Sequence, residues 1–444
     1  VSDDNRKRFK SYGWNYLQVN GHDVKQIYRA IKKVQNSKKP TCISCKTVIG
    51  YGSPNKSNTS SVHGSPLGKS EINLVRKRLK WAYKPFEIPK NILSAWRNVG
   101  IVASKNAKKQ KFLLKKNNYS KRISKIVKSE KEKFFKNPEN IATRKSSEKI
   151  LNFLTKENSF LIGGSADLSG SNNTKTKHHK IIKPGNFDGN YIHYGVREHA
   201  MAGIANGLST YGLIPYVGTF LVFINYCLAS IRLSAISKHQ VLYILTHDSI
   251  GLGEDGPTHQ PIESLTILRS IPNSLTFRPA DGNETNGCYI EALKAKNNPS
   301  CICLSRQSLP QLENSSSVEV SMGGYILYEF DTTKQLDLII IATGSEVSLS
   351  LEVAKELSSK LNVRLVSMPC VELFDSQSVE YKNKILPNNI KKLSVEAGST
   401  IGWYKYADYC FGIDSYGASG KGNDVMDYFG FSKKKLLEYI NKYI

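Results

Sequence analysis

Positions 338–342 read Leu-Ile-Ile-Ile-Ala, and this apolar run constrains the fold more than any other feature of the sequence. A strand without polar positions must be buried on both faces, which is typical of a parallel sheet covered by helices. Turn residues follow at 343–346, and positions 347–357 then suit a helix. Strand–turn–helix units of this kind predict α/β domains with doubly wound, mostly parallel sheets.

The same unit recurs along most of the chain. Further strands are expected at 160–162, 241–246, 276–279, 301–306, 363–366 and 392–396, and helices at 146–156 and 432–443. Residues 163–167 predict the turn after the first of these strands. Apolar residues step by four along another expected helix, at Val196, Ala200, Ile204 and Leu208. Ligands of such folds bind at the carboxyl ends of strands, so a site is expected there.

The first hundred residues also have an α/β pattern. Strands are expected at 16–19 and up to Ile49, and Asp23 can cap the helix between them, with Gln26 three residues on. One face of that helix carries apolar residues, namely Val24, Ile27, Tyr28, Ile31 and Val34. The pattern divides the chain at 1–100, a basic connector at 101–139, a second unit at 140–315 and a third at 316–444.

The chain has 444 residues, 40% of them apolar, and a formal net charge of +26. This apolar content excludes wholesale disorder, and no apolar run of about 18 residues is present to form a membrane-spanning helix. Residues 105–136 hold thirteen Lys and Arg against Glu130 and Glu132. A nucleic-acid patch is one interpretation. A partly helical, solvated connector is favoured, because Lys and Asn are frequent elsewhere, so neither a nucleic acid nor a membrane is expected as partner.

Eight cysteines in a chain of this length do not suggest a disulfide scaffold. Cys42 and Cys45 have C-x-x-C spacing, but no second pair follows at zinc-finger spacing. Buried, reduced thiols on a strand are therefore favoured over metal or redox chemistry. Reduced thiols, and a start that does not read as a signal peptide, favour a reducing, cytoplasmic location, while an N-terminal segment missing from this sequence leaves organelle targeting open.

The densest group of titratable residues lies at 246–261, directly after an expected strand. Glycines and prolines separate His247, Asp248, Glu254, Asp255 and His259. Such residues set a fixed, irregular backbone that a ligand can approach closely, which indicates a functional loop. A zinc site is less suitable because His247 and His259 are twelve residues apart, without helical i, i+4 spacing. No metal ligand is assigned.

Several motifs, taken in their order and spacing, resemble those of the transketolase family. They are found at residues 21–23, 46–56, 163–168, 194–201, 247–261, 304–307 and 342–347. The resemblance covers nearly the whole chain except the basic connector. It implies transfer of a two-carbon ketol unit from a ketose phosphate to an aldose phosphate, as in the pentose phosphate pathway, with thiamine diphosphate and Mg²⁺ or Ca²⁺ as cofactors.

The resemblance also implies a domain plan and a partner. Residues 1–100 would be the C-terminal part of a diphosphate-binding domain, 140–315 a pyrimidine-binding domain and 316–444 a C-terminal domain. In the family, the cofactor lies between the first domain of one subunit and the second domain of its partner. A homodimer with its active site at the subunit interface is therefore implied.

Two catalytic residues are carried over by motif. Glu198 matches the glutamate beside N1′ of the aminopyrimidine, where a carboxylate favours the imino tautomer that takes the thiazolium C2 proton. From the sequence alone, a carboxylate stabilised by a helix dipole is an equal alternative. His259 matches a histidine next to the reacting carbonyl, where an imidazole can donate to developing oxyanion charge.

The other implied contacts fall into two sets. Cofactor contacts are expected from His63, Asp167, Glu198, Phe220, Phe223 and Tyr226, although Tyr226 also suits the core face of a helix. Substrate contacts are expected from Arg144, Ser171, His247, Asp255, His259 and Arg306. Two guanidiniums suit a phosphate because each can form charge-assisted, bidentate bonds. Asp255 matches the residue that reads the ketose C2 hydroxyl.

The sequence departs from the family pattern at its start. The Gly-Asp-Gly motif and a later asparagine, which hold metal and diphosphate in the family, are not in this sequence. We therefore expect a fragment of a longer subunit, with the metal ligands in the missing segment and no tight cofactor binding by this chain alone. A catalytically inactive, transketolase-like partner or regulator is the alternative. Dihydroxyacetone synthase and deoxyxylulose phosphate synthase are related enzymes, but residues 248–251 and 417–420 look like transketolase.

Overall fold

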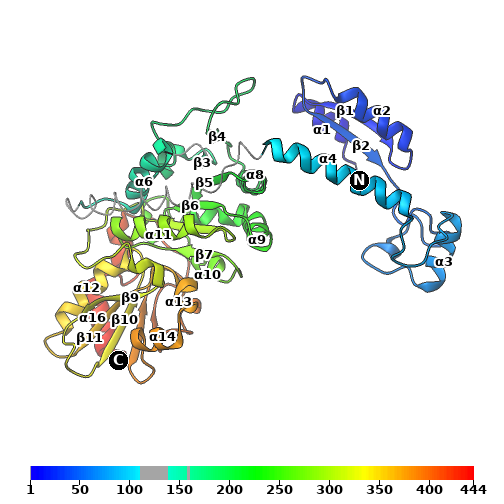
Figure 1. Ribbon diagram of the computed structural model, residues 1–444. Helices are drawn as coiled ribbons and strands as arrows, with labels where there is room; N and C mark the ends of the chain where they lie inside the picture. The colour runs from blue at the N-terminus through cyan, green and yellow to red at the C-terminus, as the bar shows by residue number, and fades with distance from the viewer. Residues whose placement is uncertain (1, 111–138, 158–160) are drawn as a thin grey trace. The chain divides into compact units, whose positions relative to one another are not determined.

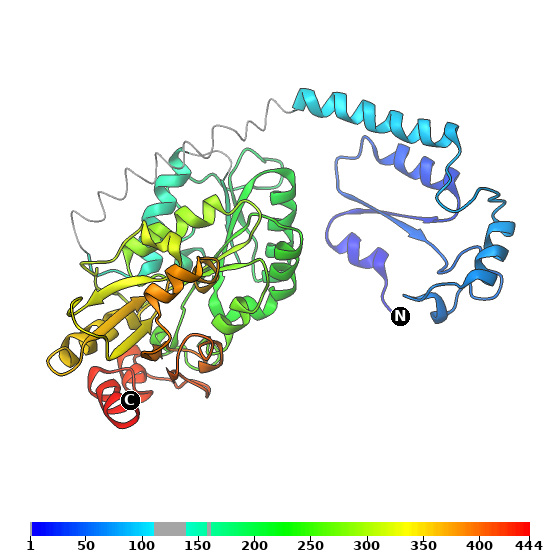
Figure 2. The same ribbon diagram turned by 60° about the horizontal axis from the view of Figure 1, so that its bottom comes forward.

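The structure is a computed structural model that describes residues 2–110, 139–157 and 161–444. The chain divides into two compact units, Val1–Phe112 and Leu113–Ile444 (Figure 1 and Figure 2). Both units mix helices with mostly parallel sheets, which confirms the predicted fold class.

The first unit is built on one βαβ unit. Strands β1 (Asn15–Asn20) and β2 (Thr41–Lys46) pair in parallel, with α2 (Val24–Val34) between them in the chain. The Asp23 carboxylate accepts hydrogen bonds from the backbone N–H groups of Lys25 and Gln26, which confirms the predicted cap. The other helices of the unit are α1 (Asn5–Ser11), α3 (Lys69–Arg78) and α4 (Lys90–Gln110).

The apolar face predicted for α2 is only partly buried. Ile27 and Val34 are half-buried, whereas Val24, Tyr28 and Ile31 are exposed. A sheet of two strands presents too little surface to cover a whole apolar helix face. The strand predicted up to Ile49 also ends earlier, at Lys46, and Ile49 lies in an exposed turn.

The prediction of buried thiols at Cys42 and Cys45 is wrong. Cys42 is half-buried and Cys45 is exposed, and both are free. The two residues lie three apart on β2, and successive side chains of a strand point to opposite faces. Their thiols therefore project from opposite faces of the sheet, which also disfavours a shared metal or a disulfide.

Only the start of the basic connector falls within the described residues. Helix α4 continues to Gln110, so the connector begins as a helix, in line with the partly helical expectation. The remainder of the basic stretch, 111–138, lies outside the described residues.

The second unit begins with a six-stranded, all-parallel sheet in the order β4-β3-β5-β6-β8-β7. Its strands are β3 (Leu161–Ser165), β4 (Tyr191–His193), β5 (Ile214–Phe220), β6 (Leu242–Thr246), β7 (Leu275–Phe277) and β8 (Ser300–Leu304). Its helices are α6 (Thr143–Glu157), α7 (Ser169–Asn172), α8 (Glu198–Tyr211), α9 (Leu228–Ile236), α10 (Ser264–Arg269) and α11 (Gly282–Lys294). Because all strands run the same way, the carboxyl ends of β3, β5, β6 and β8 share one edge.

A five-stranded sheet follows in the order β13-β12-β10-β11-β9, with only β9 antiparallel to its neighbour. Its strands are β9 (Tyr325–Glu329), β10 (Leu338–Ala342), β11 (Val363–Ser367), β12 (Lys391–Val395) and β13 (Tyr409–Phe411). Its helices are α12 (Glu346–Leu357), α13 (Val371–Asp375), α14 (Val379–Ile385), α15 (Gly422–Tyr428) and α16 (Lys433–Tyr443).

Strand β10 has the double-sided burial that its sequence predicts. Leu338, Ile340 and Ala342 belong to one hydrophobic core, and Ile339 and Ile341 belong to another on the opposite face of the sheet. All five side chains are at most 1% exposed. The apolar run is therefore the centre of a sheet covered on both sides.

Two details of the second unit differ from the prediction. The residues expected to form a turn at 163–165 complete β3, and the turn begins at Ala166. Helix α8 is present, but its buried face is Glu198, Met201, Ala202 and Ala205 rather than the predicted row. Val196 and Ile204 of that row are exposed. A spacing of four residues does not fix which apolar face of a helix packs on the sheet.

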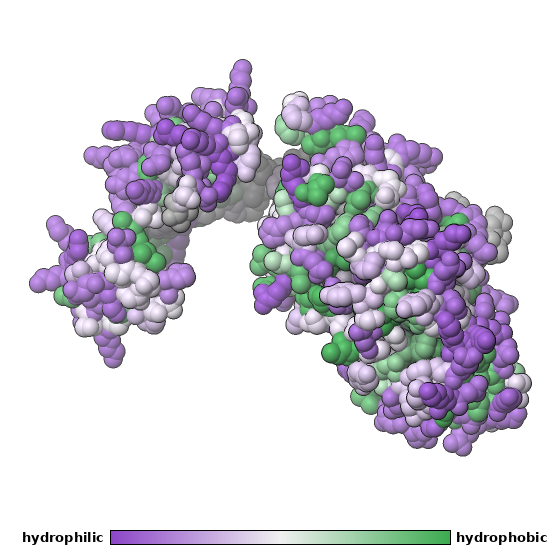
Figure 3. All heavy atoms as spheres, turned by 180° about the vertical axis from the view of Figure 1, so that it is seen from behind, coloured by the Kyte–Doolittle hydropathy of each residue, from purple (hydrophilic) through white to green (hydrophobic). Residues whose placement is uncertain are grey.

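The surface combines polar cover with apolar patches. Figure 3 shows hydrophobic side chains in patches among a mostly hydrophilic surface. Exposed apolar residues on α8 and α9 include Ile204, Tyr211, Leu233 and Ile236. In the described ranges, no helix combines the length and the apolar character needed to cross a membrane.

Candidate active site

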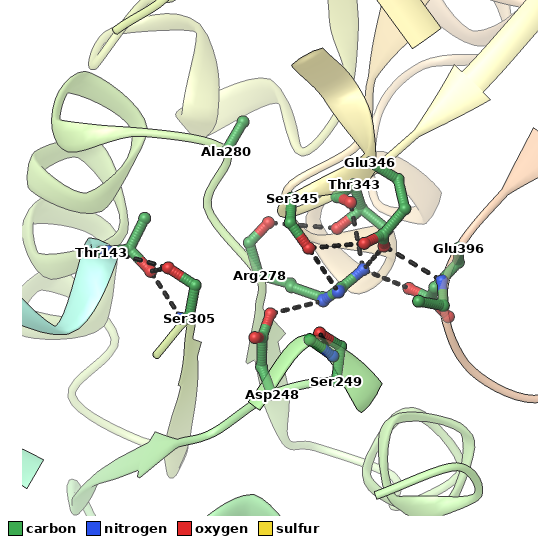
Figure 4. A network of polar contacts seen from close by, with 12 residues as sticks. Thr143, Asp248, Ser249, Arg278, Ala280, Ser305, Thr343, Ser345, Glu346 and Glu396 are labelled. Carbon is green, nitrogen blue, oxygen red and sulfur yellow. Dashed lines mark hydrogen bonds and ion pairs between the residues drawn. The ribbon is translucent and has the colours of Figure 1, made fainter. Parts of the chain in front are cut away.

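Thr143 and Ser305, the chain neighbours of Arg144 and Arg306, are joined by hydrogen bonds (Figure 4). Thr143 N donates to Ser305 Oγ at 3.0 Å, and Ser305 N donates to Thr143 Oγ1 at 2.7 Å. Both residues are at most 1% exposed. This buried pair fixes the start of α6 against the end of β8, so Arg144 and Arg306 emerge beside each other at the carboxyl edge of the sheet.

Arg144 also reaches the third expected member of the substrate site. Its Nη1 donates to the backbone oxygen of Ser171 at 2.7 Å, while its buried Nε has no partner among the described residues. Burial, and then the positive charge of Arg306, lowers the pKa of the Arg144 guanidinium from its usual value. Two neighbouring guanidiniums, one of which has a donor without a partner among the described residues, are suited to an anion.

His247 lies between these arginines and His259. Its φ of 63° is in the left-handed region, which is uncommon for a residue other than glycine and is frequent at functional sites. Its imidazole lies 3.7 Å from the Phe220 ring, centroid to centroid. Burial, and then the charges of Arg144, Arg306 and His259, lowers the pKa of His247 to about 3. His247 is therefore neutral at physiological pH.

The expected aromatic residues line the same region. Phe220 and Phe223 are stacked with centroids 5.5 Å apart, and Tyr226 lies 5.9 Å beyond Phe223. The His259 ring is 6.2 Å from Phe220 and 5.4 Å from Phe223. Tyr226 is 66% exposed, so the alternative that it faces the core is wrong.

Glu198 begins α8 and is 7% exposed. Among the described residues, its carboxylate has no hydrogen-bond or ion-pair partner, and its charge contributes, after burial, to raising the pKa of Cys227 to about 12. The side chain is largely buried, but its carboxylate oxygens are not enclosed and stay accessible at the edge of the sheet. This position leaves the Glu198 carboxylate available to bind a ligand group.

Asp167 and Asp255 are not joined to this cluster by any contact in the described parts of the second unit, and a third expected residue, His63, belongs to the first unit. Asp167, which has a φ of 62°, follows β3 and is exposed. Asp255 lies exposed in the loop between η4 (Ile250–Leu252) and Gln260. His63 is exposed in the first unit, where Glu71 orders the preceding loop by accepting hydrogen bonds from Asn55 N and Asn55 Nδ2.

The loop that carries His259 is supported by the C-terminal part of the chain. Gln260 Nε2 donates to the Ala418 oxygen at 2.9 Å. A side chain at Gly417 would overlap Gln260, and a Cβ at Gly422 would lie 2.6 Å from the Gly251 oxygen. Glycine is therefore required at both positions for the two loops to pack this closely.

A buried ion network that the sequence analysis missed holds the start of the same loop (Figure 4). Arg278, 0% exposed, donates to Asp248 Oδ2 at 2.9 Å, and its Nη1 also pairs with Glu346 and donates to the Thr343 oxygen. Burial lowers the pKa of Arg278, but Glu346, Asp248 and Glu396 outweigh it and leave the pKa above its usual value. The network links the 246–261 loop to the segments that directly follow β7, β10 and β12. The only sequence signal was a position at a predicted strand end.

The residues of this edge fit one end of the expected cofactor better than the other. The unpaired Glu198 and the stacked Phe220 and Phe223 rings provide a carboxylate and an aromatic surface of the kind an aminopyrimidine needs. For the metal and diphosphate end, no group of three or more His, Cys, Asp or Glu in the described ranges is arranged to hold a metal ion.

Comparison with known families agrees with these observations. The transketolase thiamine diphosphate binding domain matches residues 1–136, the transketolase pyrimidine binding domain matches 139–311, and the transketolase-like C-terminal domain matches 323–432. These matches support thiamine diphosphate as the cofactor class.

Individual relatives match over the whole chain. A transketolase of Buchnera aphidicola subsp. Baizongia pistaciae is 42% identical, with 100% of this chain aligned to 70% of the relative. Transketolase 1 of Saccharomyces cerevisiae is also 42% identical, over 100% of this chain and 68% of its own length. The structure of a Pichia stipitis transketolase in complex with sedoheptulose 7-phosphate superposes with a TM-score of 0.88 at 38% identity, covering 99% of this chain and 68% of that one. These matches confirm the expected resemblance and the expectation of a transferase enzyme, and the chain belongs to the transketolase family.

Proposed function

We propose that this chain transfers a two-carbon ketol unit from a ketose phosphate to an aldose phosphate, as in the pentose phosphate pathway. The observation that carries the proposal is the convergence of Arg144, Arg306, His247 and His259 at one sheet edge, beside the Phe220 ring. Cationic groups suit a sugar phosphate, and an aromatic surface suits the cofactor. The sedoheptulose 7-phosphate bound to the Pichia stipitis relative is a substrate of the proposed kind.

Substrate phosphate is assigned to the arginine pair. Arg144 Nε has no partner among the described residues, and the buried Thr143–Ser305 pair holds its backbone against that of Arg306. A charge-assisted hydrogen bond contributes about 1.5–3 kcal/mol, well above the 0–1 kcal/mol of an exposed ion pair. Ser171 and His247 complete this phosphate site, and Asp255 in the adjoining loop reads the C2 hydroxyl of the ketose.

Catalysis is assigned to Glu198 and His259. Thiamine diphosphate, when bound, would supply the carbon nucleophile. Glu198 would bind N1′ of the pyrimidine and favour its imino tautomer, and its lack of a hydrogen-bond or ion-pair partner among the described residues supports the role. Phe220, Phe223 and Tyr226 orient the pyrimidine ring. His259 donates a hydrogen bond to the substrate oxygen on which negative charge develops, and Thr258 Oγ1 orients its Nδ1 at 2.9 Å.

A homodimer and a divalent metal are part of the same proposal. The exposed apolar residues Ile204 and Tyr211 on α8, and Leu233 and Ile236 on α9, offer a face that a second copy can cover. His63 and Asp167 are assigned to the cofactor, with His63 near its diphosphate. Mg²⁺ or Ca²⁺ would be bound together with the cofactor, and none of its ligands is assigned to the described residues.

Direct measurement of the reaction products tests the function. The purified protein is given xylulose 5-phosphate, ribose 5-phosphate, thiamine diphosphate and Mg²⁺, and the sugar phosphates are separated and quantified. We expect a triose phosphate and a seven-carbon ketose phosphate to form in equal amounts. Cofactor binding without any product would instead favour the inactive partner, and Arg306→Gln serves as the control for the phosphate site.

A further inference from the structure

Four buried side chains form a continuous hydrogen-bond chain beneath the substrate site. They are Ser165 at the end of β3, Asn172 at the end of α7, and Thr246 and His247 at the end of β6. Three of the four are 0% exposed, and His247 is 3% exposed. Sequence reasoning singled out only His247, so the role of the other three has to come from the direction of each hydrogen bond.

The direction can be followed from the inner end. The Ser165 hydroxyl donates its single proton to the Gly218 oxygen at 3.1 Å, so it accepts from the Asn172 amide nitrogen at 3.3 Å. The amide oxygen of Asn172 therefore points to Thr246 and accepts from its hydroxyl at 2.7 Å. Thr246 has then used its only proton.

Counting hydroxyl protons in the same way fixes the direction of the hydrogen bond between Thr246 and His247. Thr246 Oγ1 lies 2.9 Å from His247 Nδ1, and since its proton goes to Asn172 it accepts from an Nδ1–H group. The Phe220 ring packs against the imidazole and holds its orientation. The charges of Arg144, Arg306 and His259 act on the His247 ring. Asp248, which follows His247 in the sequence, has its carboxylate bound to Arg278. None of these neighbours favours a second proton on His247.

We propose that Thr246 and Asn172 are positioning residues that keep the His247 proton on Nδ1, so that Nε2 meets the substrate phosphate as an acceptor and phosphate binding takes up a proton. The inference rests on the proposed function, because it needs the phosphate to reach His247. Nε2 cannot donate to a phosphate dianion. One proton from solvent must join the complex, either on the phosphate oxygen that faces Nε2 or on Nε2 itself.

The proton count distinguishes this arrangement from a simple arginine clamp. A phosphate monoester has its second pKa near 6, so it is a dianion at pH 7.5. Two arginines and a donating His247 would bind the dianion without proton exchange. With Nε2 as acceptor, about one proton is taken up for each phosphate bound.

Calorimetry with ribose 5-phosphate measures this number, from titrations at pH 7.5 in two buffers of different ionisation enthalpy. We expect uptake of about one proton in the wild type and in Thr246→Ser, which keeps the hydroxyl. Thr246→Val removes the acceptor for Nδ1–H and frees the other tautomer, so uptake falls towards zero. Equal uptake in the valine and serine variants, or none in the wild type, would overturn the inference.

The tautomer itself can be read without any ligand. In the ¹⁵N spectrum of protein labelled at histidine, with His247→Gln for assignment, we expect a protonated Nδ1 and a bare Nε2 from pH 6 to 8. A protonated Nε2 at neutral pH would contradict the inference even if Thr246→Val proved unstable. Failure of the proposed function looks different, since ribose 5-phosphate would then not bind, or would bind equally well to Arg306→Gln.

Discussion

Arg278 Nε donates to Asp248 Oδ2 at 2.9 Å, and the two side chains are 0% and 2% exposed. This pair joins the end of β7 to the residue that follows His247, while the same guanidinium is held by Glu346, the first residue of α12. The 246–261 loop is thus anchored to the C-terminal domain, to which no catalytic residue is assigned. The C-terminal domain therefore affects the site through the position of its loops.

Removal of the central cation should be strongly destabilising. Arg278→Met leaves the buried carboxylates of Asp248 and Glu346 without their shared counter-ion, whereas Glu396 keeps its pair with Arg269. Breaking a buried ion pair in this way costs about 3–5 kcal/mol. Urea denaturation followed by circular dichroism measures the loss. Lys433→Met, which removes an exposed pair with Glu356, is the matched control and should leave stability nearly unchanged. Similar losses in both variants would contradict the account.

A second buried carboxylate should make stability depend on pH. Glu284 accepts from Ala280 N, Tyr325 and Ser367, and burial, then the charge of Asp281, raises its pKa to about 7. Its ordinary pKa is 4.5, so between pH 4.5 and 7 the folded state binds more protons than the unfolded state. Stability from this group is complete below pH 4.5 and is lost as pH rises to 7.

The variant Glu284→Gln tests this dependence, because an amide has no proton to lose. The melting temperature of the wild type should fall relative to that of Glu284→Gln between pH 5 and pH 8. The expected difference is on the order of 1–3 kcal/mol of stability. Parallel melting curves for the two proteins over this range would show that Glu284 does not titrate there.

Much of the fold follows from local pattern. The run at β10 predicts a doubly covered strand because each of its positions is apolar, and Asp23 predicts a helix start because its carboxylate can reach the first free N–H groups. Helix faces are harder to predict. On α8, apolar and small residues occur on both sides, and the packing of the sheet decides that Met201 and Ala205 are buried and Ile204 is not. The division at residues 100, 139 and 315 stays a prediction.

The site was predictable only in part. The motifs that resemble the family predict His247, Arg144 and Arg306, and these are brought together at one edge. Arg278 and Asn172 were missed because each is a single polar residue whose partners come from distant parts of the chain. Only the order of strands in the sheet shows that they meet. The assigned roles of individual site residues stay predictions until they are measured.

Substitution of Arg306 should weaken binding of the substrate phosphate without slowing the catalytic step. Arg306→Gln removes one charge-assisted contact worth about 1.5–3 kcal/mol, which corresponds to a rise in KM for ribose 5-phosphate of roughly 10–100-fold. Turnover with glycolaldehyde, which has no phosphate, should change little. Arg364→Gln is the control, since this arginine pairs with Glu329 in the C-terminal sheet. Equal losses with both acceptors would argue against a phosphate contact at Arg306.

Substitution of His259 should slow the catalytic step and have little effect on substrate binding. Positioned proton transfer or donation typically contributes about 10²–10⁴-fold to a rate. We expect His259→Ala to lower kcat by such a factor while KM for ribose 5-phosphate changes only a few-fold. His239→Ala, whose ring contacts Thr210 at the far end of α8, should leave both constants near those of the wild type. Turnover of His259→Ala near the wild-type rate would exclude the proposed role.

Glu198 is proposed to act on the cofactor. The most direct test of this role is the rate at which the C2 proton of added thiamine diphosphate exchanges for deuterium, measured by quenched-flow NMR with wild type and Glu198→Gln. Glutamine has nearly the same shape but cannot hold the pyrimidine N1′ as a carboxylate does. The account predicts exchange slowed by at least about 100-fold in Glu198→Gln, with cofactor still bound. Equal exchange rates in the two saturated proteins would contradict it.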